Sequence, residues 1–503
     1  DSLSYELRAL SRAGATARVA FSRTTYVGPD ATGQLTLRDP ELNEPTTLDS
    51  QRVVVRTQAA PSGIELLLRE TQANSGQFRA SFGFSSSSGR TYVVPVNPAD
   101  TLLVSYEDAY PDTTVTTSAP FYEVEPPRFA PQLAGPASQA TAVTTFPTLA
   151  WSNIDVAERY RVQVATDSSF QNIVQERVIT DTTVTLDRLE KETAFVWRVR
   201  AENVVRGPWS DLVRFTTQSA EVMADIQRSF GDAARAKDYR LVALPGAANR
   251  DLAEVISGEN GVEWQAYWDN GSDRDYLAKY DGSDTFRFQP GRGFWLTSTD
   301  AWSFDETVAT VDLRRSSTYA IGLHEGWNII ANPLAQDVSW SAIQGAHSDT
   351  LQTLWRFDGA FQQADTLRSA KGGEAFYFLN DQGLDSLTVP YPGEEASKIG
   401  AESTRGARLI ALTARSASGP QVTSTVRMGT APRAARGRGA FDVIAPPSQF
   451  SEFSLRITPS EKEVRALAPR YRNWSTDVRP PASKGHTYRL RLQGMPGATV
   501  QLV

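Results

Sequence analysis

The chain of 503 residues contains no cysteine and only three histidines, which are His324, His347 and His486. Without cysteine there is no disulfide, no thiolate nucleophile and no cysteine-ligated zinc. The histidines lie far apart in the sequence, so a histidine metal site or a Ser-His-Asp triad would have to draw on this small set. The lack of cysteine does not fix the compartment, because a disulfide-free chain with large cores also folds outside the cell.

The sequence also lacks an excess of basic residues and a long apolar run. Lys and Arg number 51 against 58 Asp and Glu, and the net charge is −7. This balance argues against a sequence-independent nucleic-acid surface. No run of 18 apolar residues occurs, so no transmembrane helix is predicted. The chain opens at Asp1 in strand-like sequence without a signal peptide, and we expect a mature or excised piece of a longer precursor.

Short strand-like segments are abundant, and several of them alternate apolar with polar residues. Clear examples are residues 52–56, 160–164 and 195–199. Helical periodicity is rare: one helix is expected over about Ala220–Ala236, and short helical turns near Asp251 and Ser339. Many short strands punctuated by Gly, Pro and Asn predict an all-β fold of tandem β-sandwich domains with few short helices.

The length predicts three to five domains, and proline-rich or polar seams divide the chain into four. The seams are residues 125–131, 216–219 and 391–395. The predicted domains are 1–126, 127–217, 218–395 and 396–503. Proline at such a joint stiffens it and removes a backbone donor that would extend a strand ladder. We expect each domain to bury its own hydrophobic interior.

The first domain carries oxygen-bearing side chains at alternate loop positions, which is a pattern that suits a hard cation. Ca²⁺ takes six to eight oxygen ligands, so the loop would need further carboxylates to complete a shell. The candidate ligands are Asp39, Glu41, Asn43, Glu70 and Asp108, with Asp49 as a further donor. The alternative is plain turn chemistry, because Asp and Asn bond their own backbone in loops. Ca²⁺ is the one cofactor that the sequence suggests.

The first domain also resembles a β-sandwich repeat module of large secreted bacterial proteins. The resemblance rests on three segments: 39–43, 70–78, and 100–101 leading to 106–108. Glu41 departs from the pattern, which has Asp there. Within the second segment, Asn74-Ser75-Gly76 is expected to form a tight turn between strands rather than a site.

The second domain resembles a fibronectin type III module over about 90 residues. The matching segments are 147–151, 160–167, 189–203, 207–210 and 215–217. Trp151 takes the place of the core indole, and Phe195 stands where the family usually has Tyr. The resemblance implies two packed sheets with loops at both ends, but function does not follow from the fold. The chain has no Arg-Gly-Asp tripeptide, so a rigid spacer is expected, with a binding surface on the end loops as the alternative.

The third domain contains an internal repeat with an offset of roughly 80 residues. Residues 239–245, 280–286 and 291–296 parallel residues 326–333, 357–361 and 372–379. Each copy predicts strand, short helix, strand, Asp-Gly hairpin, glycine corner and aromatic strand, packed as a pseudo-symmetric β domain. The segment 326–333 resembles one found in surface and secreted proteins of the Bacteroidetes and Rhodothermus–Salinibacter groups.

Aromatic residues are dense in this third domain. They are Trp264, Tyr267, Trp268, Trp295, Trp302, Trp327, Trp340 and Trp355. An exposed row would stack on sugar rings, whereas aromatics repeated at matching positions favour a core. The fourth domain has strands near 409–412, 422–426 and 487–492, and resembles a β-sandwich that follows the third domain in the same surface proteins. We expect it to be truncated at its C-terminus, and we expect the basic stretch 433–438 to be a solvated loop.

No catalytic motif is present: the sequence has no G-x-S-x-G, H-E-x-x-H, phosphate-binding loop or dinucleotide fingerprint. We therefore predict a non-enzymatic, extracellular structural or interaction segment of a bacterial cell-surface or secreted protein. It would act as a stalk, coat or adhesion element through protein partners or self-assembly at exposed strand edges. The alternatives are the C-terminal accessory region of a secreted hydrolase, such as a subtilisin-like protease, and a set of carbohydrate-binding modules.

Overall fold

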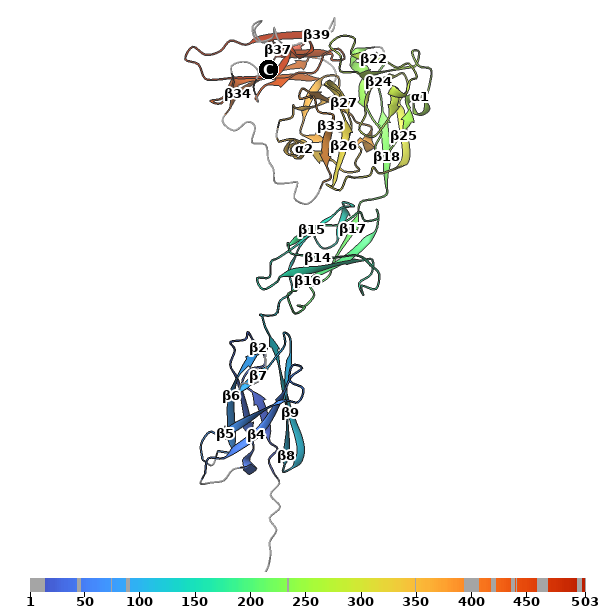
Figure 1. Ribbon diagram of the computed structural model, residues 1–503. Helices are drawn as coiled ribbons and strands as arrows, with labels where there is room; N and C mark the ends of the chain where they lie inside the picture. Colours follow the sequence, from blue (N-terminus) through green and yellow to red (C-terminus); the bar gives the residue numbers. More distant parts are fainter. Residues whose placement is uncertain are drawn as a thin grey trace, which may run out of the picture. The chain divides into compact units, whose positions relative to one another are not determined.

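A computed structural model describes most of the chain. The described residues are 14–42, 47–73, 75–86, 91–232, 235–348, 350–392, 407–417, 422–435, 439, 441–458, 469–494 and 500–502. About half of the chain is strand and only 5% is helix, with two short α-helices among the described residues, so the predicted all-β class is confirmed (Figure 1). None of the described helices is long and apolar enough to cross a membrane. The chain divides into two compact units, residues 1–138, 148–184 and 195–214, and residues 139–147, 185–194 and 215–503.

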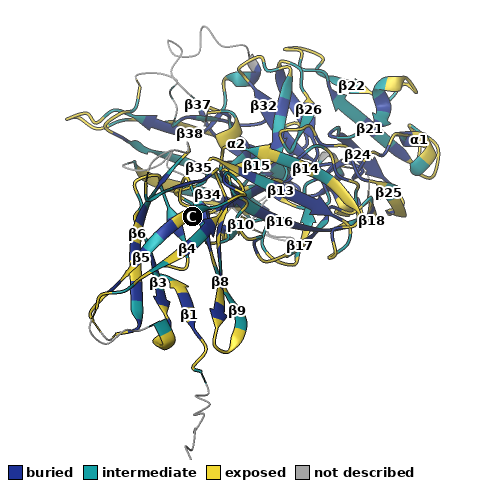
Figure 2. Ribbon diagram, turned by 60° about the horizontal axis from the view of Figure 1, so that its bottom comes forward, coloured by how far each residue is buried: buried dark blue, intermediate teal, exposed yellow. Residues whose placement is uncertain are grey.

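The N-terminal module is one curled sheet in the order β1-β3-β6-β5-β4-β8-β9-β2, with β7 paired to β6. Its strands are β1 (Arg18–Phe21), β2 (Tyr26–Val27), β3 (Gly33–Arg38), β4 (Ser50–Arg56), β5 (Ile64–Glu70), β6 (Gln77–Ser85), β7 (Val93–Pro95), β8 (Thr101–Ala109) and β9 (Asp112–Tyr122). Alternate side chains point inward: Leu102, Val104 and Tyr106 of β8 are buried in one cluster. The hairpin end of β8 and β9 is exposed (Figure 2).

The next module packs a three-stranded sheet, β10-β12-β15, against a five-stranded one, β11-β17-β16-β13-β14. Its strands are β10 (Leu133–Gly135), β11 (Ala140–Val143), β12 (Thr148–Trp151), β13 (Arg159–Ala165), β14 (Ile173–Ile179), β15 (Thr183–Thr185), β16 (Ala194–Glu202) and β17 (Val213–Thr217). Trp151 is buried, as predicted, with its ring centroid 6.2 Å from that of Trp197. The two-sheet, fibronectin type III-like arrangement is confirmed.

Residues 221–390 form two half-modules with the same strand order. The first half-module comprises β18 (Glu221–Arg228), β19 (Arg240–Val242), β20 (Arg250–Asp251), α1 (Leu252–Val255), β21 (Trp264–Asp269), β22 (Leu277–Lys279), β23 (Arg287–Phe288), β24 (Phe294–Ser298) and β25 (Trp302–Ala309). The second comprises β26 (Thr318–Gly322), β27 (Gly326–Ile330), β28 (Val338–Ser339), α2 (Trp340–Ala346), β29 (Leu354–Phe357), β30 (Phe361–Ala364), β31 (Thr366–Leu367), β32 (Phe376–Asn380) and β33 (Ser386–Pro390). The sheets β18-β25, β19-β24-β21-β22 and β20-β23 recur as β26-β33, β27-β32-β29-β30 and β28-β31.

The helix expected over Ala220–Ala236 is wrong, because this segment begins with strand β18. Its residues have good helix propensity, but Val222, Ala224 and Ile226 alternate with exposed neighbours and are buried. The period of two and pairing with β25 override local preference. The two helical turns are confirmed, with Asp251 and Ser339 as the N-cap residues of α1 and α2.

The strand pairing also corrects the alignment of the two copies. Tyr267 pairs with Trp295, and Trp355 pairs with Tyr377, so these pairs are equivalent. The hairpin between β29 and β30 contains Asp358-Gly359, whereas the equivalent hairpin between β21 and β22 contains Asn270-Gly271. The segment 280–282 follows β22, and its predicted match to the Asp358 hairpin is wrong. A short motif misled the alignment because Asp-Gly and Asn-Gly both suit such turns.

The glycine corners of the two copies are equivalent, and through them each half-module completes the other. Gly291 and Gly373 both have left-handed backbones, with φ of 90° and 72°. After the first corner, the Gly293 amide donates to the Ile329 carbonyl at 3.2 Å. After the second, the Ala375 amide donates to the Leu241 carbonyl at 3.3 Å. Each copy therefore needs backbone hydrogen bonds from the other copy to satisfy the strand that follows its glycine corner.

Residues 408–502 add a seven-stranded sheet in the order β39-β37-β38-β35-β34-β40, with β36 paired to β38. Its strands are β34 (Arg408–Ser416), β35 (Thr423–Thr430), β36 (Val443–Ile444), β37 (Phe453–Thr458), β38 (Trp474–Arg479), β39 (Arg489–Gly494) and β40 (Val500–Leu502). The boundary predicted at 395 lies outside the described residues, and the four domain limits stay predictions.

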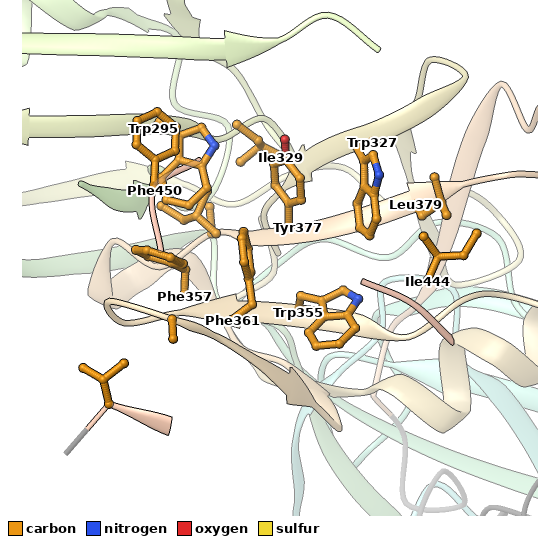
Figure 3. Packing of buried hydrophobic residues seen from close by; sticks show 14 of the residues in the cluster. Trp295, Trp327, Ile329, Trp355, Phe357, Phe361, Tyr377, Leu379, Ile444 and Phe450 are labelled. Carbon is orange, nitrogen blue, oxygen red and sulfur yellow. The ribbon is translucent and has the colours of Figure 1, made fainter. Parts of the chain in front are cut away.

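The half-modules and this C-terminal sheet share one hydrophobic core, so the expectation of a separate interior for each domain is wrong here. Trp295 and Tyr377 present an aromatic face that Phe450 and Trp474 help to enclose. The rings of Trp295 and Phe450 have centroids 4.5 Å apart (Figure 3). The paired half-modules expose an apolar face, and the C-terminal sheet buries this face.

A buried ion pair joins the same two regions. The Arg470 guanidinium lies 2.5 Å from Asp269 Oδ2, and the Tyr377 hydroxyl donates to the same carboxylate. The Asp269 side chain is fully buried, and that of Arg470 is 4% exposed. The guanidinium also stacks on the Tyr276 ring, 3.8 Å from its centroid. Because both charges are buried, removing either partner would leave the other charge unpaired and would strongly lower the free energy of unfolding.

Candidate metal centre

Three carboxylates converge at one end of the N-terminal module. Asp39 follows β3, Glu41 lies in the 3-10 turn Pro40–Leu42, and Asp108 is near the end of β8. One oxygen from each lies within 4.8 Å of the others. Asp39 and Asp108 are buried, and Glu41 is exposed. The structure thus brings together three of the five predicted ligands.

Backbone amides hold these carboxylates in place. The Ala15 amide donates to Glu41 Oε1 at 2.9 Å, and the Ala17 amide donates to Asp108 Oδ2 at 2.6 Å. The Tyr110 amide donates to Asp108 Oδ1 at 2.9 Å. The segment that enters β1 therefore crosses the cluster. These donors stabilise the negative charges, but neutral amides leave the net charge of the three carboxylates in place.

Tyr106 is the fourth side chain of the cluster. Its hydroxyl donates to Asp39 Oδ2 at 2.7 Å, and the ring is buried in the module's core. Burial raises the pKa of the Tyr106 phenol, and its hydrogen bond to the Asp39 carboxylate raises it further. The tyrosine therefore stays a neutral donor that fixes the orientation of Asp39.

Glu70, a predicted ligand, is not part of this group. Its Oε1 accepts from the amides of Ser75 and Gly76 at 2.8 and 2.9 Å, and its Oε2 accepts from the Asp49 amide at 3.2 Å. Burial alone would raise the pKa of Glu70, but these backbone donors lower it. Glu70 therefore stabilises the turn before β6 by accepting hydrogen bonds from its backbone. This agrees with the alternative that the acidic residues serve turn formation. Asn43 lies outside the described residues, as does Asn74 of the predicted tight turn.

The cluster can accept a hard cation chemically. Among the described residues, no basic side chain forms an ion pair with Asp39, Glu41 or Asp108. Three carboxylates would supply at least three oxygens, and Ca²⁺ would take the remainder from backbone carbonyls and water. Sequence spacing pointed to Asp39 and Glu41 because they share a loop. The roles of Tyr106 and the Ala15 and Ala17 amides have no local signal, since they arrive from distant strands.

The other sequence candidates have different surroundings. Six of the tryptophans that would make a sugar-stacking row are buried: Trp264, Trp295, Trp302, Trp327, Trp340 and Trp355. Tyr267 and Trp268 are partly buried and pack on the cores. The core interpretation therefore accounts for these aromatics. Arg433 is exposed, while Arg436 and Arg438 lie outside the described residues.

In the fibronectin type III-like module, a layer of charged and aromatic side chains covers the sheet that contains β13 and β16. Arg159, Arg161 and Arg200 all contact the Glu202 carboxylate, whose side chain is 1% exposed. Burial would raise the pKa of Glu202, but the three guanidinium groups outweigh it and hold it at about 2. The Trp209 ring lies under Arg198 and Arg200, at 4.2 and 4.4 Å from its centroid. This layer stabilises the sheet: the Glu202 carboxylate is paired with three guanidinium groups, and Arg198 donates to the Gln163 side-chain oxygen.

Comparison with solved structures finds fibronectin type III domains. The chain is similar to the FN1–FN3 domains of chicken CNTN1, with 11% identity over 63% of this chain and 92% of that one, and a TM-score of 0.19. It is also similar to a two-domain fibronectin type III segment of chicken tenascin, with 12% identity over 40% and 98%, and a TM-score of 0.21. No family model and no curated protein matches the chain. The assignment of the module at 127–217 rests on its own strand order.

Proposed function

We propose that this chain is a non-catalytic, extracellular segment of a bacterial surface or secreted protein that makes protein–protein contacts. Fibronectin type III-like modules are typically structural or interaction modules. The chain joins such a module to further β modules, and this serial architecture supports a role as a stalk or coat element. The proposed contacts are made by strand edges, which offer unpaired backbone groups to a neighbouring chain.

Strand β39 is the observation that carries this proposal. It is the terminal strand of its sheet and, among the described residues, pairs with β37 alone. Its Leu490 and Leu492 stand opposite the buried Ile457 and Leu455, yet they are 40% and 45% exposed. The apolar face thus continues past the covered core to an open edge. Such an edge suits an added strand from a partner or a second copy.

Surface location and edge contact are tested separately. Antibody against the chain should label intact cells of the source organism, and labelling only after lysis would overturn the extracellular assignment. Sedimentation velocity or chemical crosslinking of the full chain with its native surface extract should show a complex that the Leu490→Lys, Leu492→Lys variant loses. The matched control is Leu103→Lys on the exposed face of β8, where the side chain is 45% exposed but the strand has two neighbours. Equal complex formation by both variants would exclude β39.

We further propose that Asp39, Glu41 and Asp108 bind Ca²⁺ and so lock the start of β1 to the end of β8. The supporting observation is the convergence of three carboxylates without a described basic partner. Excess Ca²⁺ should raise the thermal midpoint of the N-terminal module, since a ligand that binds only the folded state stabilises it by mass action. Asp39→Asn with Asp108→Asn should abolish this shift, whereas Asp100→Asn, a turn carboxylate in the same module, should retain it. An unchanged midpoint with EDTA and with Ca²⁺ would contradict the proposal.

A further inference from the structure

A cavity of about 470 Å³ opens beside the second half-module. Its wall includes three arginines, Arg356 of β29, Arg368 after β31, and Arg427 of β35. The buried ring of Phe376 and the Ala364 side chain line its apolar part. Strands from two distant parts of the chain therefore bring positive charge to one hollow. Because Phe376 excludes water from one side, an ionic contact made there is stronger than one on an open surface.

Two of the three guanidinium groups of this cavity are held by hydrogen bonds without being neutralised. Arg356 donates to the Gln362 side-chain oxygen, and Arg427 Nη1 donates to Gln363 Oε1 at 3.0 Å. An amide oxygen orients a guanidinium but carries no charge. Among the described residues, no carboxylate lies within ion-pair distance of either group. Two positive charges are thus preorganised and uncompensated.

The remaining charges at the cavity do not cancel this excess. Arg368 lies 3.7 Å from Glu374, and both side chains are partly solvated. Asp365 is the one carboxylate among the residues that line the cavity, and it is exposed. The whole protein has a net charge of −7, so a general attraction of anions to its surface is disfavoured. Any affinity for anions must arise locally.

Among the described residues, the positions of the first half-module that are equivalent to Arg356 and Gln363 carry no arginine. By strand register, Trp268 is the equivalent of Arg356, and Lys279 is the equivalent of Gln363. Trp268 packs on the core of its half-module and meets the His324 ring edge to face, with centroids 5.4 Å apart. The fold therefore does not require an arginine here, since the same backbone position accepts a large apolar side chain.

We propose that this cavity binds the oxyanion group of a small ligand, a carboxylate, sulfate or phosphate, between Arg356 and Arg427. The planar fork of a guanidinium matches two oxygens of such a group, and a charge-assisted bond of this kind is about twice as strong as a neutral one. Gln362 and Gln363 fix the orientation of the two guanidinium groups before the ligand binds, and this lowers the entropy cost of binding. This site is independent of the proposed strand-edge contacts.

The test is calorimetric titration of the full chain with inorganic phosphate, sulfate and acetate at constant ionic strength set with chloride. We expect saturable binding of at least one of these anions, and the rank among them identifies the group. Arg356→Gln with Arg427→Gln should weaken it by at least about tenfold. Arg250→Gln, which removes one exposed arginine paired with Glu306 in the first half-module, is the control for loss of a surface arginine and should bind as the wild type does.

A second variant covers the case in which the double substitution perturbs the fold. Gln363→Glu keeps both arginines and places a carboxylate beside Arg427, so it should also weaken binding by about tenfold or more while leaving the thermal midpoint unchanged. Lack of saturable binding by the wild type would overturn the proposal. So would equal loss in the Arg250→Gln control, or full binding by Gln363→Glu.

Discussion

The two half-modules share a backbone plan and differ in what their side chains do. Where they face the common core, both copies are apolar or aromatic, as with Trp295 and Tyr377. Elsewhere they diverge: on the opposite face of the strand Trp268 corresponds to Arg356, and within the core-facing row Asp269 corresponds to Phe357. Strand pairing needs only backbone groups and a buried face, so the outer positions were free to acquire separate roles. In the first copy Asp269 forms an ion pair with Arg470 of the C-terminal region, and in the second copy Arg356 lines a basic cavity.

The largest expected effect comes from the shared core. Trp295→Ala should lower the free energy of unfolding by about 3–5 kcal/mol, because it leaves a cavity among Phe357, Phe450 and Tyr377. Hydrogen exchange should speed up both in β27 and β32 and in β37 and β38. If the C-terminal sheet kept its protection, the two regions would not unfold together and the shared-core account would fail. Phe82→Ala in the N-terminal module, which has a core of its own, is the control.

The next effect concerns the buried ion pair of the first copy, whose Asp269 is replaced by Phe357 in the second copy. Arg470→Met should cost about 3 kcal/mol, because it leaves the Asp269 carboxylate buried with Tyr377 as its main remaining partner. Adding Asp269→Asn should restore much of the loss, since the orphaned charge is then gone. Denaturant titration of the two single variants and the double variant measures this coupling. Additive losses would show that the pair does not act as a unit.

The equivalent hairpin glycines should respond unequally. Both have a left-handed backbone, with φ of 78° at Gly271 and 72° at Gly359. A Cβ at Gly271 would clash with the Glu325 carbonyl oxygen, whereas at Gly359 its nearest neighbour is a Val422 methyl group at 3.3 Å. Gly271→Ala should cost about 2–3 kcal/mol and Gly359→Ala about 1 kcal/mol, the ordinary strain of an L-residue there. Equal thermal midpoints would show that the hairpins are interchangeable.

The last prediction lies outside the two half-modules, in the fibronectin type III-like module. The folded-state pKa of Glu202 is about 2, below its ordinary 4.5, so its ionised form stabilises the fold above pH 4.5. That stability should be lost as the pH falls from about 4.5 towards 2. Glu202→Gln should remove about 1–2 kcal/mol at neutral pH and flatten this acid dependence. Hydrogen exchange in β13, β14 and β16 measures it, with the half-modules as internal reference; an unaltered acid profile would contradict it.

Much of the fold could be predicted because alternation of apolar and polar residues is a local property. Trp151, the β13 and β16 segments and the caps at Asp251 and Ser339 lie where the sequence placed them. The segment after Ala220 failed because its helix-forming residues also fit a period of two, and only pairing with β25 decides between them. For the candidate metal centre, the sequence predicted the loop with Asp39 and Glu41. It could not predict that Glu70 lies apart from this loop.

The sequence by itself determined the class of the protein: short amphipathic strands, a fibronectin type III-like module, an internal repeat and no catalytic motif. Only the tertiary structure decided three further features. The two copies of the repeat bond to each other through their glycine corners, the C-terminal sheet shares their core, and Arg356 and Arg427 line one cavity. The physical reason is range. Alternation and turn chemistry act over a few residues, whereas register, shared burial and charge clusters depend on which distant strands become neighbours.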